Sequence, residues 1–162
     1  MASTRLADQR GDHDMLITVL TFLHVLTMFT VVALHSGPQV LIVAARRSQP
    51  AAIPSIAAAY ARSGRLVPPL GILGGLLGLA VAMNGGYDLR APWLLIAYAL
   101  FVAIIVYGAR VTVPFIATLG ETIRDGREDD AELLGSRLLW VFAVDAAIYA
   151  LVIADMVLKP LS

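Results

Sequence analysis

The sequence contains no cysteine among its 162 residues. A chain without thiols cannot form disulfides, thiolate zinc sites or iron–sulfur clusters, and it cannot attach a c-type haem covalently. Charge is also scarce, since 15% of the residues are charged and 12 Lys and Arg balance 12 Asp and Glu. Because no basic surplus exists to attract a polyanion, we expect no nucleic-acid partner.

The residues that are present are mostly apolar. Hydrophobic residues make up 59% of the chain, and the mean hydropathy is +0.79. These values are typical of an integral membrane protein. Four crossings of about 20 residues each would fill about half of the chain and leave only short loops. The sequence therefore predicts a single all-α domain, a transmembrane four-helix bundle in a lipid bilayer.

Four apolar stretches define the predicted spans, at about 15–45, 66–83, 92–115 and 138–158. The first is longer than a hydrocarbon core of about 30 Å requires, so it must tilt, bend at Gly37-Pro38 or extend beyond the membrane. Pro50 and Pro54 interrupt the helix after this span. The Ala-rich run 55–62 that follows predicts a short interfacial helix with Ser55 as its N-cap.

The second span contains two overlapping GxxxG pairs, Gly71 with Gly75 and Gly74 with Gly78. Glycines at this spacing allow the backbone of another helix to approach closely. We interpret both faces as packing surfaces. They are candidate contacts for a homo-oligomer or for a larger membrane complex.

The distribution of positive charge predicts the orientation in the membrane. Seven arginines lie in the connections after the first and third spans, at positions 46, 47, 62, 65, 124, 127 and 137, against four basic residues on the other side. Cytoplasmic loops carry an excess of Lys and Arg. Both longer loops are therefore predicted to be cytoplasmic, and both termini are predicted to lie outside.

Four ionisable residues interrupt the apolar spans: His24, His35, Arg110 and Asp145. Such residues are functional candidates, because a charge in hydrocarbon is costly. One hypothesis is a direct pair between Arg110 and Asp145, which His35 joins to form a proton relay. The alternative is that Arg110 reaches the headgroups while Asp145 is protonated or bonded to Tyr107 or a threonine.

His24 and His35 are 11 residues apart, which places them on one helix face about 16 Å apart. They cannot share one metal ion or one haem, so each needs a partner from another helix. For His24 the soft donors expected at similar depth are Met83 and Met156, which suits haem b or copper. The alternative is that both histidines are neutral and bonded to Ser, Thr or backbone carbonyls.

The segments TFLHVL, LVPPLGILGGLLGL and APWLLIAYALFV together resemble a family of bacterial four-helix integral membrane proteins with no assigned function. The resemblance covers roughly residues 15 to 120. That family is similar to the copper-resistance D proteins and the HemJ-type protoporphyrinogen oxidases, whose first helix carries a histidine. His24 is the matching position, so the resemblance implies a bacterial cytoplasmic membrane and haem binding through His24. The chain matches no second haem ligand and no catalytic lysine of that group, since Lys159 is its only lysine.

No catalytic motif fixes the activity. The sequence contains no phosphate-binding loop, no Ser-His-Asp pattern and no HExxH, and whether the chain is an enzyme stays open. Three hypotheses follow. The first is a small binding or accessory protein that carries haem b through His24. The second is a transport or proton-relay component that uses His35, Arg110 and Asp145, and the third is a structural subunit without a site.

Overall fold

A computed structural model describes the backbone of residues 2–158 and the side chains of residues 11–127 and 129–158. Over this part of the chain the regular structure is entirely helical. The elements, in order, are α1 (Ala2–Ser48), η1 (Pro50–Ala52), α2 (Ile53–Ser63), α3 (Val67–Asn84), α4 (Pro92–Tyr107), η2 (Gly108–Thr112), α5 (Val113–Arg124) and α6 (Glu128–Leu158). The predicted all-α class is confirmed.

Four helical segments are long and apolar enough to cross a membrane: Gly11–Ser48, Val67–Asn84, Pro92–Arg124 and Asp129–Leu158. They coincide with the four predicted spans, and the second matches almost residue for residue. The first, third and fourth are longer than predicted, because each helix continues into polar sequence at one end or both. Their length and composition indicate a multipass membrane protein.

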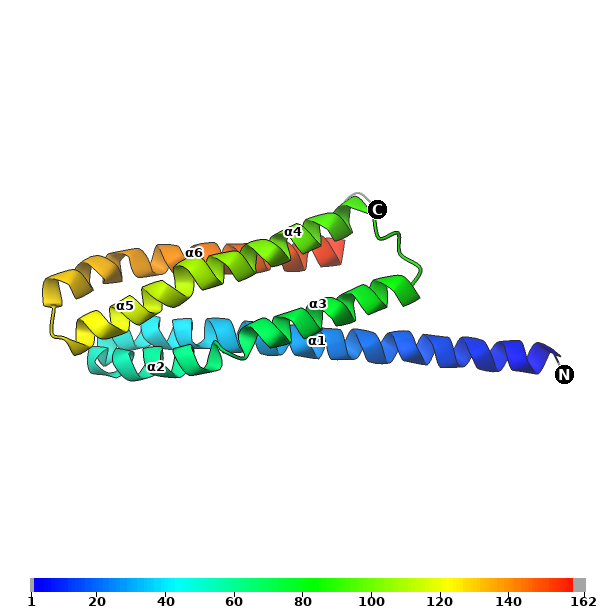
Figure 1. The fold of residues 1–162 in the computed structure, drawn as a ribbon, viewed down its shortest axis with the longest axis horizontal. Helices are drawn as coiled ribbons and strands as arrows, with labels where there is room; N and C mark the ends of the chain where they lie inside the picture. The colour runs from blue at the N-terminus through cyan, green and yellow to red at the C-terminus, as the bar shows by residue number, and fades with distance from the viewer. Residues whose placement is uncertain (1, 159–162) are drawn as a thin grey trace.

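The helices form four roughly parallel legs (Figure 1). α1 is the first leg, α2 and α3 return along it, α4, η2 and α5 form the third, and α6 is the fourth. We call the end with the α1–α2 and α5–α6 connections the loop end. The opposite end, where α1 begins and the α3–α4 link lies, is the terminal end (Figure 1).

α1 runs through Pro38 as one continuous helix of 47 residues. At about 1.5 Å per residue it is about 70 Å long, more than twice the thickness of a hydrocarbon core. Of the three options that the sequence left open, extension beyond a hydrocarbon core follows from this length, and the helix is not interrupted at Gly37-Pro38. The first turns of α1 extend past its neighbours at the terminal end (Figure 1).

α2 confirms the predicted short helix but not its predicted start. The helix begins at Ile53, and the Ser55 hydroxyl donates a hydrogen bond of 2.7 Å to the Ala52 carbonyl oxygen. The prediction of Ser55 as N-cap is therefore wrong, because an N-cap side chain accepts from a backbone N–H. α2 packs lengthwise between α1 and α5, and it buries Tyr60 in the bundle.

The two halves of the bundle are packed differently. At the loop end, residues from four helices share one buried core: Ile42, Ala45, Ile53, Ala57, Tyr60, Ile116, Leu119, Leu138 and Phe142. Toward the terminal end, α3 packs on α1 and α4 packs on α6, while the two pairs diverge (Figure 1). The candidate site lies where these two halves meet.

Both glycine faces of α3 contact side chains of the same chain. A Cβ at Gly78 would come within 2.8 Å of His24, and one at Gly74 would overlap Met28, both on α1. The other face, Gly71 and Gly75, lies against the ring of Phe101 on α4. The packing interpretation therefore holds within the chain. Association with a second chain through these faces stays a prediction.

Candidate functional site

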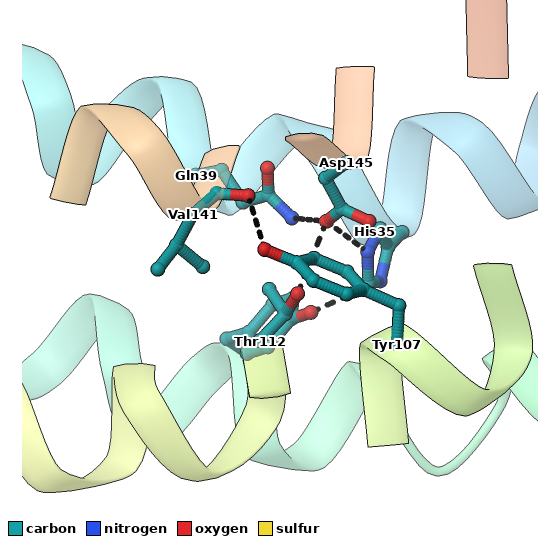
Figure 2. Close-up of polar contacts among 7 residues, drawn as sticks. His35, Gln39, Tyr107, Thr112, Val141 and Asp145 are labelled. Carbon is teal, nitrogen blue, oxygen red and sulfur yellow. Dashed lines mark hydrogen bonds and ion pairs between the residues drawn. The ribbon is translucent and has the colours of Figure 1, made fainter. Parts of the chain in front are cut away.

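Asp145 is the centre of a buried polar cluster between α1, η2 and α6 (Figure 2). Its side chain is 1% exposed. The oxygen Oδ2 lies 2.6 Å from Nε2 of His35, accepts a hydrogen bond of 2.6 Å from Nε2 of Gln39, and lies 3.4 Å from the Thr112 hydroxyl. Three polar side chains from two other elements therefore converge on one carboxylate oxygen.

His35 connects this carboxyl to Tyr60. Its Nε2 faces Asp145, and its Nδ1 lies 3.0 Å from the Tyr60 hydroxyl. Because the carboxylate accepts from Nε2–H, a neutral His35 has a free lone pair on Nδ1, and the Tyr60 hydroxyl donates to it. The cluster is thus a continuous chain of hydrogen bonds, Asp145–His35–Tyr60, that joins α6, α1 and α2.

Tyr60 retains its proton in this setting. Burial raises the pKa of the Tyr60 hydroxyl, and the nearby charge of Asp145 raises it further. Since the hydroxyl stays neutral, it can donate to Nδ1 of His35 when that nitrogen carries no hydrogen and accept from Nδ1–H when it does. Tyr60 can therefore keep its hydrogen bond to His35 whether or not Nδ1 carries a hydrogen.

The charge of the His35–Asp145 pair depends on one proton. With that proton the pair is neutral overall, as imidazolium with carboxylate or as imidazole with carboxylic acid. Without it the buried layer carries one unbalanced negative charge, which is costly in a medium of low dielectric. Asp145 Oδ1 is also buried and has no hydrogen-bond partner among the described residues.

An apolar cavity of about 290 Å³ adjoins the cluster. Its polar side chains are His35, Tyr60 and Tyr149. The remaining walls come mostly from α3, α4 and η2, and include Gly71, Phe101 and Ile104. Pro68, Ile105, Ala109 and Val113 line the cavity and are exposed, so it opens sideways between the second and third legs.

Local backbone geometry makes room for the histidine. A Cβ on Gly108 would come within 3.3 Å of the His35 ring. The same glycine begins η2, a single π-helical turn that ends at Thr112. π-turns in α-helices occur frequently at functional sites. Here the turn presents both Gly108 and Thr112 to the cluster, where both are buried.

Arg110 does not join this cluster, which corrects the hypothesis of a direct pair with Asp145. Arg110 is exposed, and no ion pair connects it to Asp145. A difference in depth along the bundle does not explain the missing contact, because Thr112, two residues from Arg110, contacts Asp145. Arg110 lies roughly half a turn from both Gly108 and Thr112, which face inward, so its side chain points away from the bundle.

His24 lies elsewhere, nearer the terminal end. Its Nδ1 is 2.8 Å from the carbonyl oxygen of Gly74, and its ring packs against Gly78. This contact matches the alternative in which the histidine bonds to a backbone carbonyl. The structure does not bring the expected thioether donors to it. Met83 is 61% exposed and lies about 140° around α3 from Gly78, and Met156 is also exposed on α6.

The alternative in which a threonine bonds to Asp145 agrees with the Thr112 contact, whereas the Tyr107 hydroxyl donates to the Val141 carbonyl oxygen. Sequence reasoning missed Gln39, Tyr60 and Tyr149. Gln39 follows His35 by four residues, so both side chains lie on one helix face, and that spacing was a signal. A search for charged residues in apolar spans passes over an uncharged amide. Tyr60 carried no signal, because its role depends on how α2 packs against α1.

Comparisons with known proteins do not assign this arrangement to a known group. No family model matches the chain, and no curated protein and no solved structure matches it.

Proposed function

We propose that this chain binds a small lipophilic molecule in the cavity beside His35, with the His35–Asp145 pair as a proton-binding group at its wall. The observation that carries the proposal is the contact between the apolar cavity and a buried, hydrogen-bonded cluster that contains a His–Asp pair. Apolar pockets with a few convergent polar groups are typical ligand sites. The sideways opening suits a molecule that arrives from the bilayer.

The ligand class follows from the cavity walls. Both nitrogens of His35 are already bonded within the protein, so the ligand meets the hydroxyls of Tyr60 and Tyr149 as polar partners. A tyrosine hydroxyl both donates and accepts a hydrogen bond. We infer a largely apolar ligand with one hydroxyl or carbonyl oxygen, no larger than the cavity of about 290 Å³.

Photolabelling tests this proposal. A small lipophilic alkyl diazirine, activated by light in membranes that contain the protein, should label Tyr60, which is 1% exposed and lines the cavity. Ala109→Phe at the mouth should reduce that labelling. Ala103→Phe, on an exposed position that does not line the cavity, is the matched control. If Tyr60 is not labelled in wild type, or if it is labelled equally in the two variants, the cavity is not a ligand site.

A second candidate is proton transfer through the chain Asp145–His35–Tyr60. The continuous hydrogen bonds favour it, because proton relays in membrane proteins consist of chains of such ionisable side chains. In vesicles that enclose a pH-sensitive dye, wild type should then conduct protons faster than His35→Leu. Equal rates in the two proteins argue against a relay. Arg110→Leu serves as the control, because Arg110 lies outside the cluster.

Haem b through His24 and an orientation with both termini outside are the remaining proposals. A Soret band that His24→Ala abolishes and His35→Ala retains supports haem, and a colourless protein from haem-replete cells contradicts it. The absence of native cysteine makes labelling of single cysteines free of background. A cysteine at Asp88 should react from outside intact cells, whereas cysteines at Ser48 and Asp129 should not.

A further inference from the structure

Arg110 is an exposed arginine within the third candidate span, Pro92–Arg124. Charged residues in apolar spans almost always face the bundle interior or a water-filled cavity, whereas this side chain points away from the bundle. Its guanidinium makes no ion pair with the described residues. A polar group outside the bundle is therefore needed to bind it.

The lengths of the second and third legs indicate which part of this span lies in hydrocarbon. α3 has 18 residues and is therefore about 27 Å long, which matches a hydrocarbon core of about 30 Å. Arg65 lies two residues before the start of α3. After the α3–α4 link, Arg110 lies 18 residues beyond Pro92, again about 27 Å. Both legs therefore place one edge of the core at the α3–α4 link and the other edge at Arg65 and Arg110.

The exposed side chains of these two legs change in character at the same level. Large apolar side chains are exposed along α3 and α4: Ile72, Leu73, Leu76, Met83, Leu95, Ile96, Val102, Ile105 and Val106. Along α2 no large apolar side chain is exposed, and along α5 the exception is its first residue, Val113, at 37%. An apolar outer face suits lipid tails, whereas a helix that is apolar only on its inner face suits water or headgroups. The edge of the core therefore lies where α2 meets α3 and where η2 meets α5.

On the first and fourth legs the apolar surface continues somewhat closer to the loop end. Leu41 on α1 and Trp140 on α6 are 57% and 76% exposed. Trp140 lies five residues, about 7.5 Å, closer to the loop end than Asp145. Tryptophan is enriched at membrane interfaces. A difference of this size between legs is expected for a tilted bundle, since transmembrane helices tilt by about 20° on average.

Arg65 and Arg110 lie on the two sides of the cavity mouth. Gly64, next to Arg65, lines the cavity from the second leg. Ala109, next to Arg110, lines it from the third leg. Both arginines are exposed, and neither is among the lining residues. The two guanidinium groups are therefore outside the cavity, one on each side of its opening, at the level where headgroups begin.

We propose that Arg65 and Arg110 together bind the phosphate of an anionic phospholipid at the cavity mouth. Guanidinium groups donate charge-assisted hydrogen bonds to phosphate oxygens, and basic sites between transmembrane helices bind anionic headgroups. Two positive charges favour a lipid with net negative charge over a zwitterionic lipid, whose ammonium group they repel. The alternative in which Arg110 reaches the headgroups thus becomes a defined site with a second residue. The inference does not rest on the ligand proposed for the cavity itself.

Native mass spectrometry of the full-length protein in detergent micelles tests the proposal. Phosphatidylglycerol titrated into wild type should bind more tightly than phosphatidylcholine with the same acyl chains. Arg65→Gln and Arg110→Gln should each weaken the binding of phosphatidylglycerol about fivefold, which corresponds to about 1 kcal/mol for an arginine near the membrane surface. Arg90→Gln, at an exposed position in the α3–α4 link, is the matched control and should leave that binding unchanged.

Three outcomes would overturn the proposal. The first is equal binding of the two lipids to wild type, a comparison that does not depend on any variant. The second is a loss of affinity in Arg90→Gln as large as in Arg65→Gln and Arg110→Gln. The third is displacement of the lipid by an excess of inorganic phosphate beyond that caused by sodium chloride of equal ionic strength, since the site would then bind free anions. Labelling of Tyr60 by the neutral diazirine tests the cavity separately, so failure of one proposal leaves the other standing.

Discussion

The coupling between His35 and Asp145 can be measured by a double-mutant cycle. Asp145→Leu removes an acceptor that receives two contacts of 2.6 Å, from His35 and from Gln39. Neutral hydrogen bonds between membrane helices contribute about 0.6 kcal/mol each, so two of them give a lower limit of about 1.2 kcal/mol. Breaking a buried charged pair costs about 3 to 5 kcal/mol. We expect a loss near the upper value, because Asp145 is 1% exposed.

The cycle isolates the contact shared by the two residues. His35→Leu removes the bonds to both Asp145 and Tyr60, so it should also lower the free energy of unfolding. A hydrogen bond to a charged group contributes about 1.5 to 3 kcal/mol. The double variant should therefore lose less than the sum of the single losses, by about that amount. The free energies come from unfolding in mixed micelles of increasing denaturing detergent, followed by circular dichroism.

Arg110 provides the control for this cycle. Because Arg110 points away from Asp145, the losses of Arg110→Leu and Asp145→Leu should add to within about 0.5 kcal/mol. Strong coupling of Arg110 to Asp145, or simple additivity of His35 and Asp145, would refute the geometry of the cluster.

Three further predictions follow from particular contacts. Gly78→Ala should lower the free energy of unfolding by about 1 to 3 kcal/mol, because the new methyl group meets the His24 ring, and His24→Ala should recover part of that loss. Gly37→Ala, where a Cβ meets no atom within 4 Å, should not destabilise the helix and is the control. Gly120→Ala should loosen the contact between α2 and α5, since its methyl group would lie 2.7 Å from Ala57, and limited proteolysis of α2 should then become faster. Above about pH 10 the free energy of unfolding of wild type should fall more steeply with pH than that of Tyr60→Phe. The pKa of Tyr60 is raised in the folded protein, so the unfolded chain releases this proton at a lower pH and is stabilised as the pH increases. Parallel pH profiles of the two proteins in thermal melts contradict this prediction.

The sequence determined most of the helical layout, because long apolar runs with prolines and glycines at their ends leave few alternatives. α3 begins near Pro68 and Pro69 and ends before Gly85, as expected from these residues. The helical state of the polar residues before 15 was not predicted, since polar residues give no periodic signal for a helix that extends beyond its neighbours.

The candidate site was only partly predictable. The search for ionisable residues in apolar spans selected both His35 and Asp145, which the structure places in direct contact. The direction of each side chain around its helix depends on which face of the helix packs inward. In the third leg the π-helical turn η2 also changes the angle between successive side chains. Pairing opposite charges therefore selected Arg110, whereas the actual partners of Asp145 are His35, Gln39 and Thr112.

The difference in packing between the two halves has a consequence for motion. Regions with few shared contacts open locally at lower free energy than a densely packed core. The α1–α3 and α4–α6 pairs can therefore fluctuate apart while the core around Ile42, Ile116 and Leu138 holds the four legs in register. Since the cavity lies at the junction of these halves, the ligand that we propose would enter and leave through opening of the terminal half, without separation of the helices at the loop end.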